Sequence, residues 1–161
     1  MELYILKILD FEMYGAEPMT FIRRYLNAAQ CLKNTVAFEL SILFMDIMVL
    51  ISPVGDTTAK KAAASVFSAL IIKNCQMDNE DSSDNLSDIW TPNMRHYAWP
   101  SYQELLPLTK LMLKTLKKIK EDEKRDLSIT MKYYSESRHH GLLNQVRHHE
   151  VDFALNYIDA L

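Results

Sequence analysis

Apolar residues recur at intervals of three and four positions along most of the chain, which is the spacing of one face of an α-helix. No stretch alternates β-branched with polar residues between turn dipeptides, as strands do. The pattern therefore predicts an all-α fold of one domain with about six helices and two terminal pieces. The expected helices cover 18–30, 34–51, 57–75, 92–98, 101–121, 126–136 and 151–161, and 1–10 has the pattern of a helix tail.

The segment 34–51 is apolar on nearly every side, which is typical of either the central helix of a soluble bundle or a membrane span. It contains Glu39 and Asp46, and each acid near a bilayer centre costs about 3 kcal/mol. We therefore predict a central core helix. The following helix, 57–75, is rich in alanine and serine, which is typical of a helix that other helices surround.

Helix-capping residues precede several of these segments. The candidates are Asn34, Asp56 or Thr57, Thr91, and the pair Ser101 and Glu104, which has the spacing of a capping box. Pro18 stands at the first position of a helix, where its missing N–H costs nothing. Pro107 lies inside the longest helix and is expected to bend or loosen its first turns.

Composition narrows the classes of function. The chain has 161 residues, of which 48% are hydrophobic and 24% charged, which suits one folded domain. A net charge of -3 offers no overall attraction for nucleic acid or an anionic membrane. Only three glycines are present, which argues against phosphate-binding loops and nucleophile elbows. Cys31 and Cys75 lie in apolar runs and are predicted to be buried thiols.

Histidines and acids are the residues that could carry chemistry. His139, His140, His148 and His149 are potential zinc ligands, but adjacent histidines on one element point in different directions and no cysteine or acid completes a zinc spacing. An exposed connector is the favoured interpretation. Glu39 and Asp46 are two helical turns apart and could form an acid–base pair, yet acids with structural roles are favoured. We assign no catalytic, cofactor-binding or metal-ligating residue.

Lysines line one side of the helix 101–121: Lys110, Lys114, Lys117, Lys118, Lys120 and, just beyond it, Lys124. They indicate either a nucleic-acid surface or a solvated helix face, and the acids at 121–123 favour the solvated face. The acidic segment 78–85 lacks the central glycine of a calcium loop and is interpreted as a solvated loop.

Several motifs, in order along the chain, resemble mitotic cyclins. Met1-Glu2 with the segment 5–12 is similar to the end of a first cyclin box, and the segment 18–25 with its paired Arg23 and Arg24 is similar to the start of a second box in the B-type branch. Further similarities are Glu39-Leu40-Ser41, Pro53, the alanines at 62–64, the interval from Trp90 to Pro107, Lys132-Tyr133, and the segment 137–141.

The resemblance implies a five-helix bundle around a central apolar helix, with the carboxy-terminal cyclin box at 15–143, a helix stub and linker at 1–14, and an extension at 144–161. It implies a regulatory subunit of a cyclin-dependent protein kinase in mitotic control. Such a subunit is not an enzyme, binds no cofactor, nucleic acid or membrane, and works in the nucleus and cytoplasm. The alternative is a helical adaptor or a degenerate cyclin that no longer activates a kinase.

One departure from the family is large. The motifs of the first cyclin box, including its substrate-docking patch, are absent, so we expect a fragment, a short isoform or a truncated gene model. Leu3, Ile5 and Leu9 would then lack the first box to pack against, and we predict self-association through this apolar stub.

Overall fold

A computed structural model describes residues 17–51, 56–76, 89–98, 100–121 and 146–160. This part of the chain contains α-helices and no strand, so the all-α prediction is confirmed. The helices are α2 (Pro18–Ala28), α3 (Thr35–Ile51), α4 (Thr58–Gln76), α6 (Pro92–Tyr97), α7 (Tyr102–Glu121) and α10 (His148–Ala160). The helices expected over 1–10 and 126–136, and the acidic segment 78–85, lie outside the described residues.

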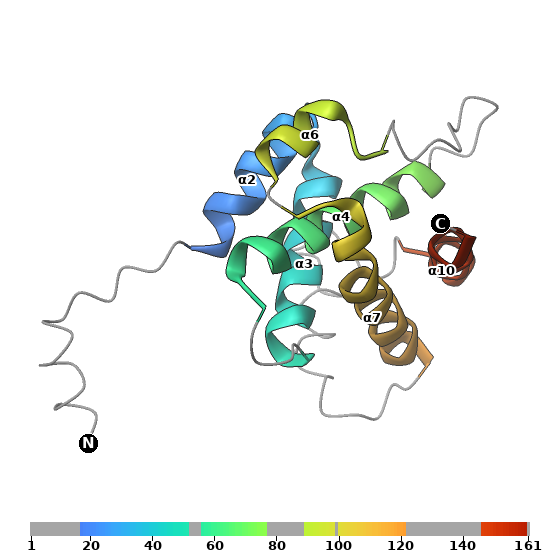
Figure 1. Cartoon of the computed structure of the whole chain (residues 1–161). Helices are drawn as coiled ribbons and strands as arrows, with labels where there is room; N and C mark the ends of the chain where they lie inside the picture. Colours follow the sequence, from blue (N-terminus) through green and yellow to red (C-terminus); the bar gives the residue numbers. More distant parts are fainter. Residues whose placement is uncertain (1–16, 52–55, 77–88, 99, 122–145, 161) are drawn as a thin grey trace, which may run out of the picture.

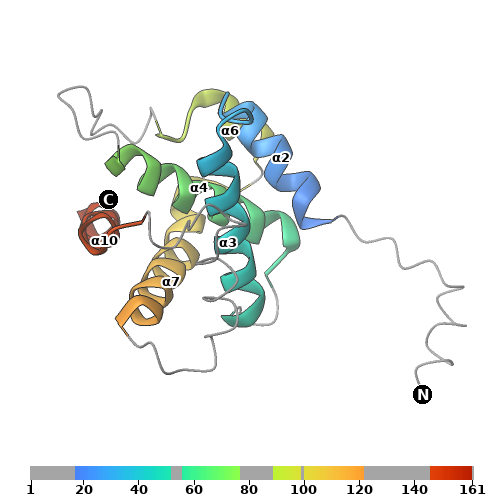
Figure 2. The same ribbon diagram turned by 180° about the vertical axis from the view of Figure 1, so that it is seen from behind.

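Helix α4 occupies the middle of the bundle and contacts α2, α3, α7 and α10, which are arranged around it (Figures 1 and 2). The side chains of Ala62, Ala63 and Ala64 are fully buried. Because alanine projects only one methyl group, neighbouring backbones can approach it closely, and α4 is enclosed as its composition predicts. Larger side chains on the same helix pack against the segments around it. Phe67 packs edge-to-face against the buried Trp90, with ring centroids 5.3 Å apart.

Helix α3 was expected to be the central rod, and the structure assigns that position to α4 instead. α3 is covered by α2, α4 and α7, but a stripe along it stays partly or fully exposed. The stripe consists of Thr35, Glu39, Ile42, Asp46, Val49 and Leu50. The difference arises because α3 carries polar residues along one line, Thr35, Glu39 and Asp46, which stay partly or fully exposed, so α3 is buried on most of its circumference but not all of it.

Side-chain caps stabilise three helix starts in the way the sequence predicts. The bonds are Ala37 N to Asn34 Oδ1 at 2.9 Å, Lys60 N to Thr57 Oγ1 at 3.3 Å, and Met94 N to Thr91 Oγ1 at 3.3 Å. Thr57 is thus the cap of α4, while Asp56 forms a 3.0 Å ion pair with Lys60. At the start of α7, Ser101 Oγ lies 3.5 Å from Glu104 Oε1, which is a weaker contact than a full capping box makes.

Two prolines lie in the helices, one at a helix start and one in a helix interior. Pro18 begins α2, as predicted. Pro107 lies inside α7, which continues through it to Glu121. Within the described segments, no helix is both long enough and apolar enough to cross a bilayer.

Candidate functional site

Two lysines of α7 form ion pairs with acids of α10. Lys117 Nζ donates to Asp152 Oδ1 at 2.6 Å, and Lys110 pairs with Asp159. Lys114 and Lys118 are exposed. Neither of the two interpretations offered by the sequence, a nucleic-acid surface or a solvated face, includes this role, because the acids that meet the lysines lie at least thirty-five positions away along the chain.

The first turn of α10 is held by a buried carboxylate. Glu150 is 3% exposed and accepts hydrogen bonds from Gln76 Nε2 at 3.1 Å and from Arg147 N at 2.9 Å. Lys120 donates to the carbonyl oxygen of Val146 beside it. Burial lowers the pKa of Lys120, and the negative charge of Glu150 opposes that shift. This polar junction joins the ends of α4 and α7 to the start of α10.

The histidines do not form a metal centre within the described residues, which contain no group of three or more potential ligands. His148 and His149 are exposed at the start of α10. His139 and His140 lie outside the described residues. Glu39 and Asp46 are both partly exposed on the stripe of α3, and each has an interaction with another group.

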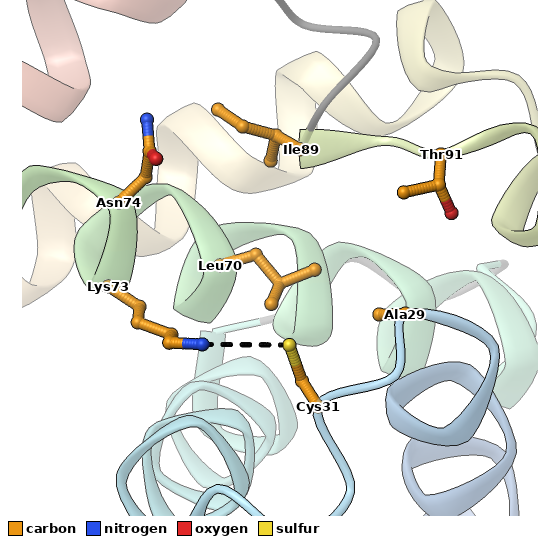
Figure 3. A pocket seen from close by; sticks show the side chains of 7 residues that line it. All are labelled: Ala29, Cys31, Leu70, Lys73, Asn74, Ile89 and Thr91. Carbon is orange, nitrogen blue, oxygen red and sulfur yellow. Dashed lines mark hydrogen bonds between the residues drawn. The ribbon is translucent and has the colours of Figure 1, made fainter. Parts of the chain in front are cut away.

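A hollow of about 120 Å³ lies where the end of α2, the C-terminal part of α4 and the segment before α6 meet. Figure 3 shows the side chains that line it: Ala29, Cys31, Leu70, Lys73, Asn74, Ile89 and Thr91. The Lys73 and Cys31 side chains point toward each other along one wall, and Ile89 and Thr91 lie across from them. The distance from Lys73 Nζ to Cys31 Sγ is 3.6 Å.

The turn after α2 determines where Cys31 lies. Gln30 adopts a positive φ of 56° and donates its N–H to the carbonyl of Asn27 at 2.9 Å, while Cys31 N donates to the carbonyl of Leu26 at 2.8 Å. These two bonds form a Schellman motif, which ends a helix with one left-handed residue. The carbonyl of Cys31 then accepts from Asn34 N at 2.9 Å, so its backbone is held on both sides.

Cys31 corrects one prediction from the sequence. It was expected to be a buried thiol in an apolar run, yet it lies in the turn between α2 and α3 and is only partly buried. Cys75 is buried, as predicted. No local signal could have revealed the contact of Cys31, because Lys73 is 42 positions away.

Exposed apolar side chains gather at the end of α3, where Val49 is 67% and Leu50 is 58% exposed. Leu111 on α7 and Phe153 on α10 are single exposed apolar residues, which are common on protein surfaces. The adjacent pair on α3 continues the stripe that carries Glu39 and Asp46. The exposed apolar pair at the end of this stripe is therefore a candidate surface for a protein partner.

A family model for the cyclin C-terminal domain matches residues 16–145. The chain belongs to the cyclin C-terminal domain family. No curated protein and no solved structure gives a significant match. Helices α2 to α7 lie within the matched residues, and α10 follows them. Cyclin domains are regulatory and non-catalytic and act through a protein partner.

Proposed function

We propose that this cyclin-domain protein is a regulatory subunit that binds a cyclin-dependent protein kinase in mitotic cell-cycle control, in the nucleus and cytoplasm. The observation that carries the proposal is the cyclin C-terminal domain match over residues 16–145. The B-type assignment is supported by Arg23 and Arg24, which are both exposed on α2. The guanidinium of Arg24 lies 5.5 Å from the centre of the Tyr97 ring on α6, so that this arginine also joins two helices.

The end of α3 supplies surface for such a partner. Val49 and Leu50 are the most exposed of the large apolar residues in the described part of the chain. Burying two aliphatic side chains against a partner contributes about 1.5–3 kcal/mol each. Association itself costs several kcal/mol, so this stripe would be one part of a larger interface.

A direct binding assay tests the proposal. The purified full chain is immobilised and titrated with a panel of purified cyclin-dependent kinases, with an unrelated kinase as the control. We expect at least one cyclin-dependent kinase to bind with a micromolar or lower Kd. Absence of binding up to roughly 100 µM, about -5.5 kcal/mol on the affinity scale, or equal binding of the unrelated kinase, contradicts the proposal.

Two variants locate the contact. Val49→Asp combined with Leu50→Asp should weaken kinase binding at least tenfold, because charged groups would have to be desolvated in an apolar contact. Leu111→Asp is the matched control on α7 and should leave the affinity unchanged.

A kinase activity assay on the same complex separates the two forms of the hypothesis. Stimulation supports an activating subunit, and binding without stimulation supports a degenerate cyclin that no longer activates a kinase.

A further inference from the structure

We propose that a hollow between α6 and the start of α7 binds a single carboxylate group that is joined to an apolar group. The volume of this α6–α7 hollow is about 330 Å³, and six residues line it: Trp90, Arg95, Ala98, Pro100, Ser101 and Tyr102. Pockets for small ligands begin at about 300 Å³, so the hollow is large enough for such a group. The inference does not depend on whether the protein binds a kinase.

The indole of Trp90 is the observation that points to a ligand. Trp90 is fully buried, yet its Nε1 has no hydrogen-bond partner in the structure. Phe67 packs edge-to-face against the indole, but a phenyl ring offers no oxygen to accept from the N–H. A buried donor without an acceptor costs free energy, and such groups are rare in folded proteins. Because Trp90 lines the α6–α7 hollow, a ligand in the hollow can supply the acceptor.

The charges around the hollow favour an anion. Arg95 on α6 lines it and forms none of the ion pairs found among the described residues. The N-terminal end of α7, which begins at Tyr102, adds a partial positive charge. Glu104 in the first turn of α7 opposes an anion, but it is exposed and does not line the hollow, so solvent screens its charge. None of the six lining residues is acidic.

A carboxylate fits this set of donors better than a phosphate. The planar guanidinium of Arg95 can bond both oxygens of a carboxylate, and one cation balances its single charge. A phosphate monoester carries a charge of about -1.5 to -2 at neutral pH, and phosphate groups on peptides are typically bound by clusters of arginines. Arg95 is the one basic residue among the six that line the hollow. The indole N–H and the Ser101 hydroxyl can add neutral hydrogen bonds.

The rest of the lining selects for an apolar group beside the carboxylate. Trp90, Ala98 and Pro100 are buried and present mostly carbon to the hollow. Two sources share this chemistry. One is a small organic acid, and the other is the C-terminal carboxylate of a polypeptide whose last side chain is apolar, which is a known mode of peptide recognition.

A titration followed by nuclear magnetic resonance tests the site on the full chain. The probe is 3-phenylpropionate, and its uncharged primary amide is the matched control ligand. The chain has two tryptophans, and the indole N–H signal that remains in Trp99→Phe belongs to Trp90. We expect the acid to bind with a Kd of about 1 mM or lower, which is ordinary for a ligand of this size. It should shift the Trp90 N–H signal downfield, and the amide should bind at least tenfold more weakly.

Variants of Arg95 test its role in binding. Arg95→Gln should raise the Kd of 3-phenylpropionate about tenfold, and Arg95→Lys should recover only part of the affinity, because an ammonium lacks the planar fork of a guanidinium. Arg95 is exposed, so both variants should fold, which far-ultraviolet circular dichroism verifies. Lys118→Gln removes the same charge from an exposed position near the other end of α7 and should leave the Kd unchanged.

A peptide arm distinguishes the two sources. The probes are a five-residue peptide that ends in phenylalanine with a free carboxylate and the same peptide with a C-terminal amide. If the free peptide binds at least tenfold more tightly than 3-phenylpropionate, the polypeptide source is supported. Equal or weaker binding of the peptide supports a small organic acid, and both outcomes support the shared chemistry.

Four results would overturn the proposal. They are equal affinities for the acid and its amide, an unchanged Kd in Arg95→Gln, and a Trp90 N–H signal that the acid does not move, which would leave water as the partner of the indole. The fourth is binding of inorganic phosphate as tightly as 3-phenylpropionate, which would indicate attraction of any anion rather than a carboxylate site.

Discussion

Replacing Glu150 with alanine should destabilise the protein far more than losing any exposed ion pair on the same helix. The carboxylate is 3% exposed and accepts two hydrogen bonds, from Gln76 Nε2 at 3.1 Å and from Arg147 N at 2.9 Å. A hydrogen bond to a charged group contributes about 1.5–3 kcal/mol. Water can replace part of the loss at Arg147, which is exposed, so we expect the free energy of unfolding to fall by about 2–4 kcal/mol.

The loss should be concentrated at α10. Glu150 joins the end of α4 to the start of α10, so its removal frees the helix at its first turn while the contacts among α2, α3 and α4 remain. Urea unfolding followed by circular dichroism measures the global change, and hydrogen exchange of the backbone amides of α10 measures the local one. Glu150→Gln retains one acceptor oxygen, so its free energy of unfolding should fall by about half as much as that of Glu150→Ala.

Asp159→Asn is the matched control. It removes the partner of Lys110 at an exposed pair on the same helix, and such pairs contribute at most about 1 kcal/mol. If Glu150→Ala and Asp159→Asn lowered stability equally, or if α10 exchanged no faster in Glu150→Ala than in the wild type, the argument that this junction anchors α10 would be refuted.

Three further variants test other parts of the structure. Gln30→Gly should raise the free energy of unfolding by about 0.5–1 kcal/mol, measured by urea unfolding, because glycine adopts the positive φ of 56° without the strain of a side chain. Ala63→Leu should lower it by about 1–3 kcal/mol in the same assay, because this position of α4 is fully buried against neighbouring helices. Burial raises the pKa of Tyr25 above its ordinary value of 10.0, and the charge of Arg24 partly opposes this shift. The folded state therefore keeps the phenol protonated at pH values where the unfolded chain loses the proton. The stability linked to this proton is present below pH 10 and is lost as pH rises through the folded pKa. Tyr25→Phe should therefore lose less stability than the wild type above pH 10, and parallel pH profiles of unfolding for the two proteins would contradict the assignment.

Much of the fold follows from short-range patterns. The starts of α2, α3 and α4 were predicted from Pro18, Asn34 and the pair Asp56 and Thr57, and the structure places each helix within a residue or two of the expected position. Periodicity and caps succeed because each depends on residues within four positions along the chain. The alanines of α4 likewise predicted a helix enclosed by others.

The errors share a different origin. Cys31 was expected to be buried because its neighbours are apolar, but the Schellman motif that ends α2 places it in a turn where it is only partly buried. A glutamine occupies the left-handed position where glycine is usual, so the sequence carried no signal for this turn. The lysines of α7 were interpreted as a solvated helix face or a nucleic-acid surface, but nothing in their spacing reveals that Asp152 and Asp159 pair with two of them.

The sequence by itself therefore determined the class of the fold, most helix boundaries and the family, since these depend on local periodicity and on motif order. Only the tertiary structure decided that α4 is the centre, that α10 pairs with Lys110 and Lys117 of α7, and that Cys31 contacts Lys73. The reason is physical: hydrophobic burial is non-directional and specifies which faces are covered, but not by which helix. The contact of Cys31 with Lys73 joins residues that are 42 positions apart, and that of Gln76 with Glu150 joins residues that are 74 positions apart. Such contacts depend on how whole helices pack together.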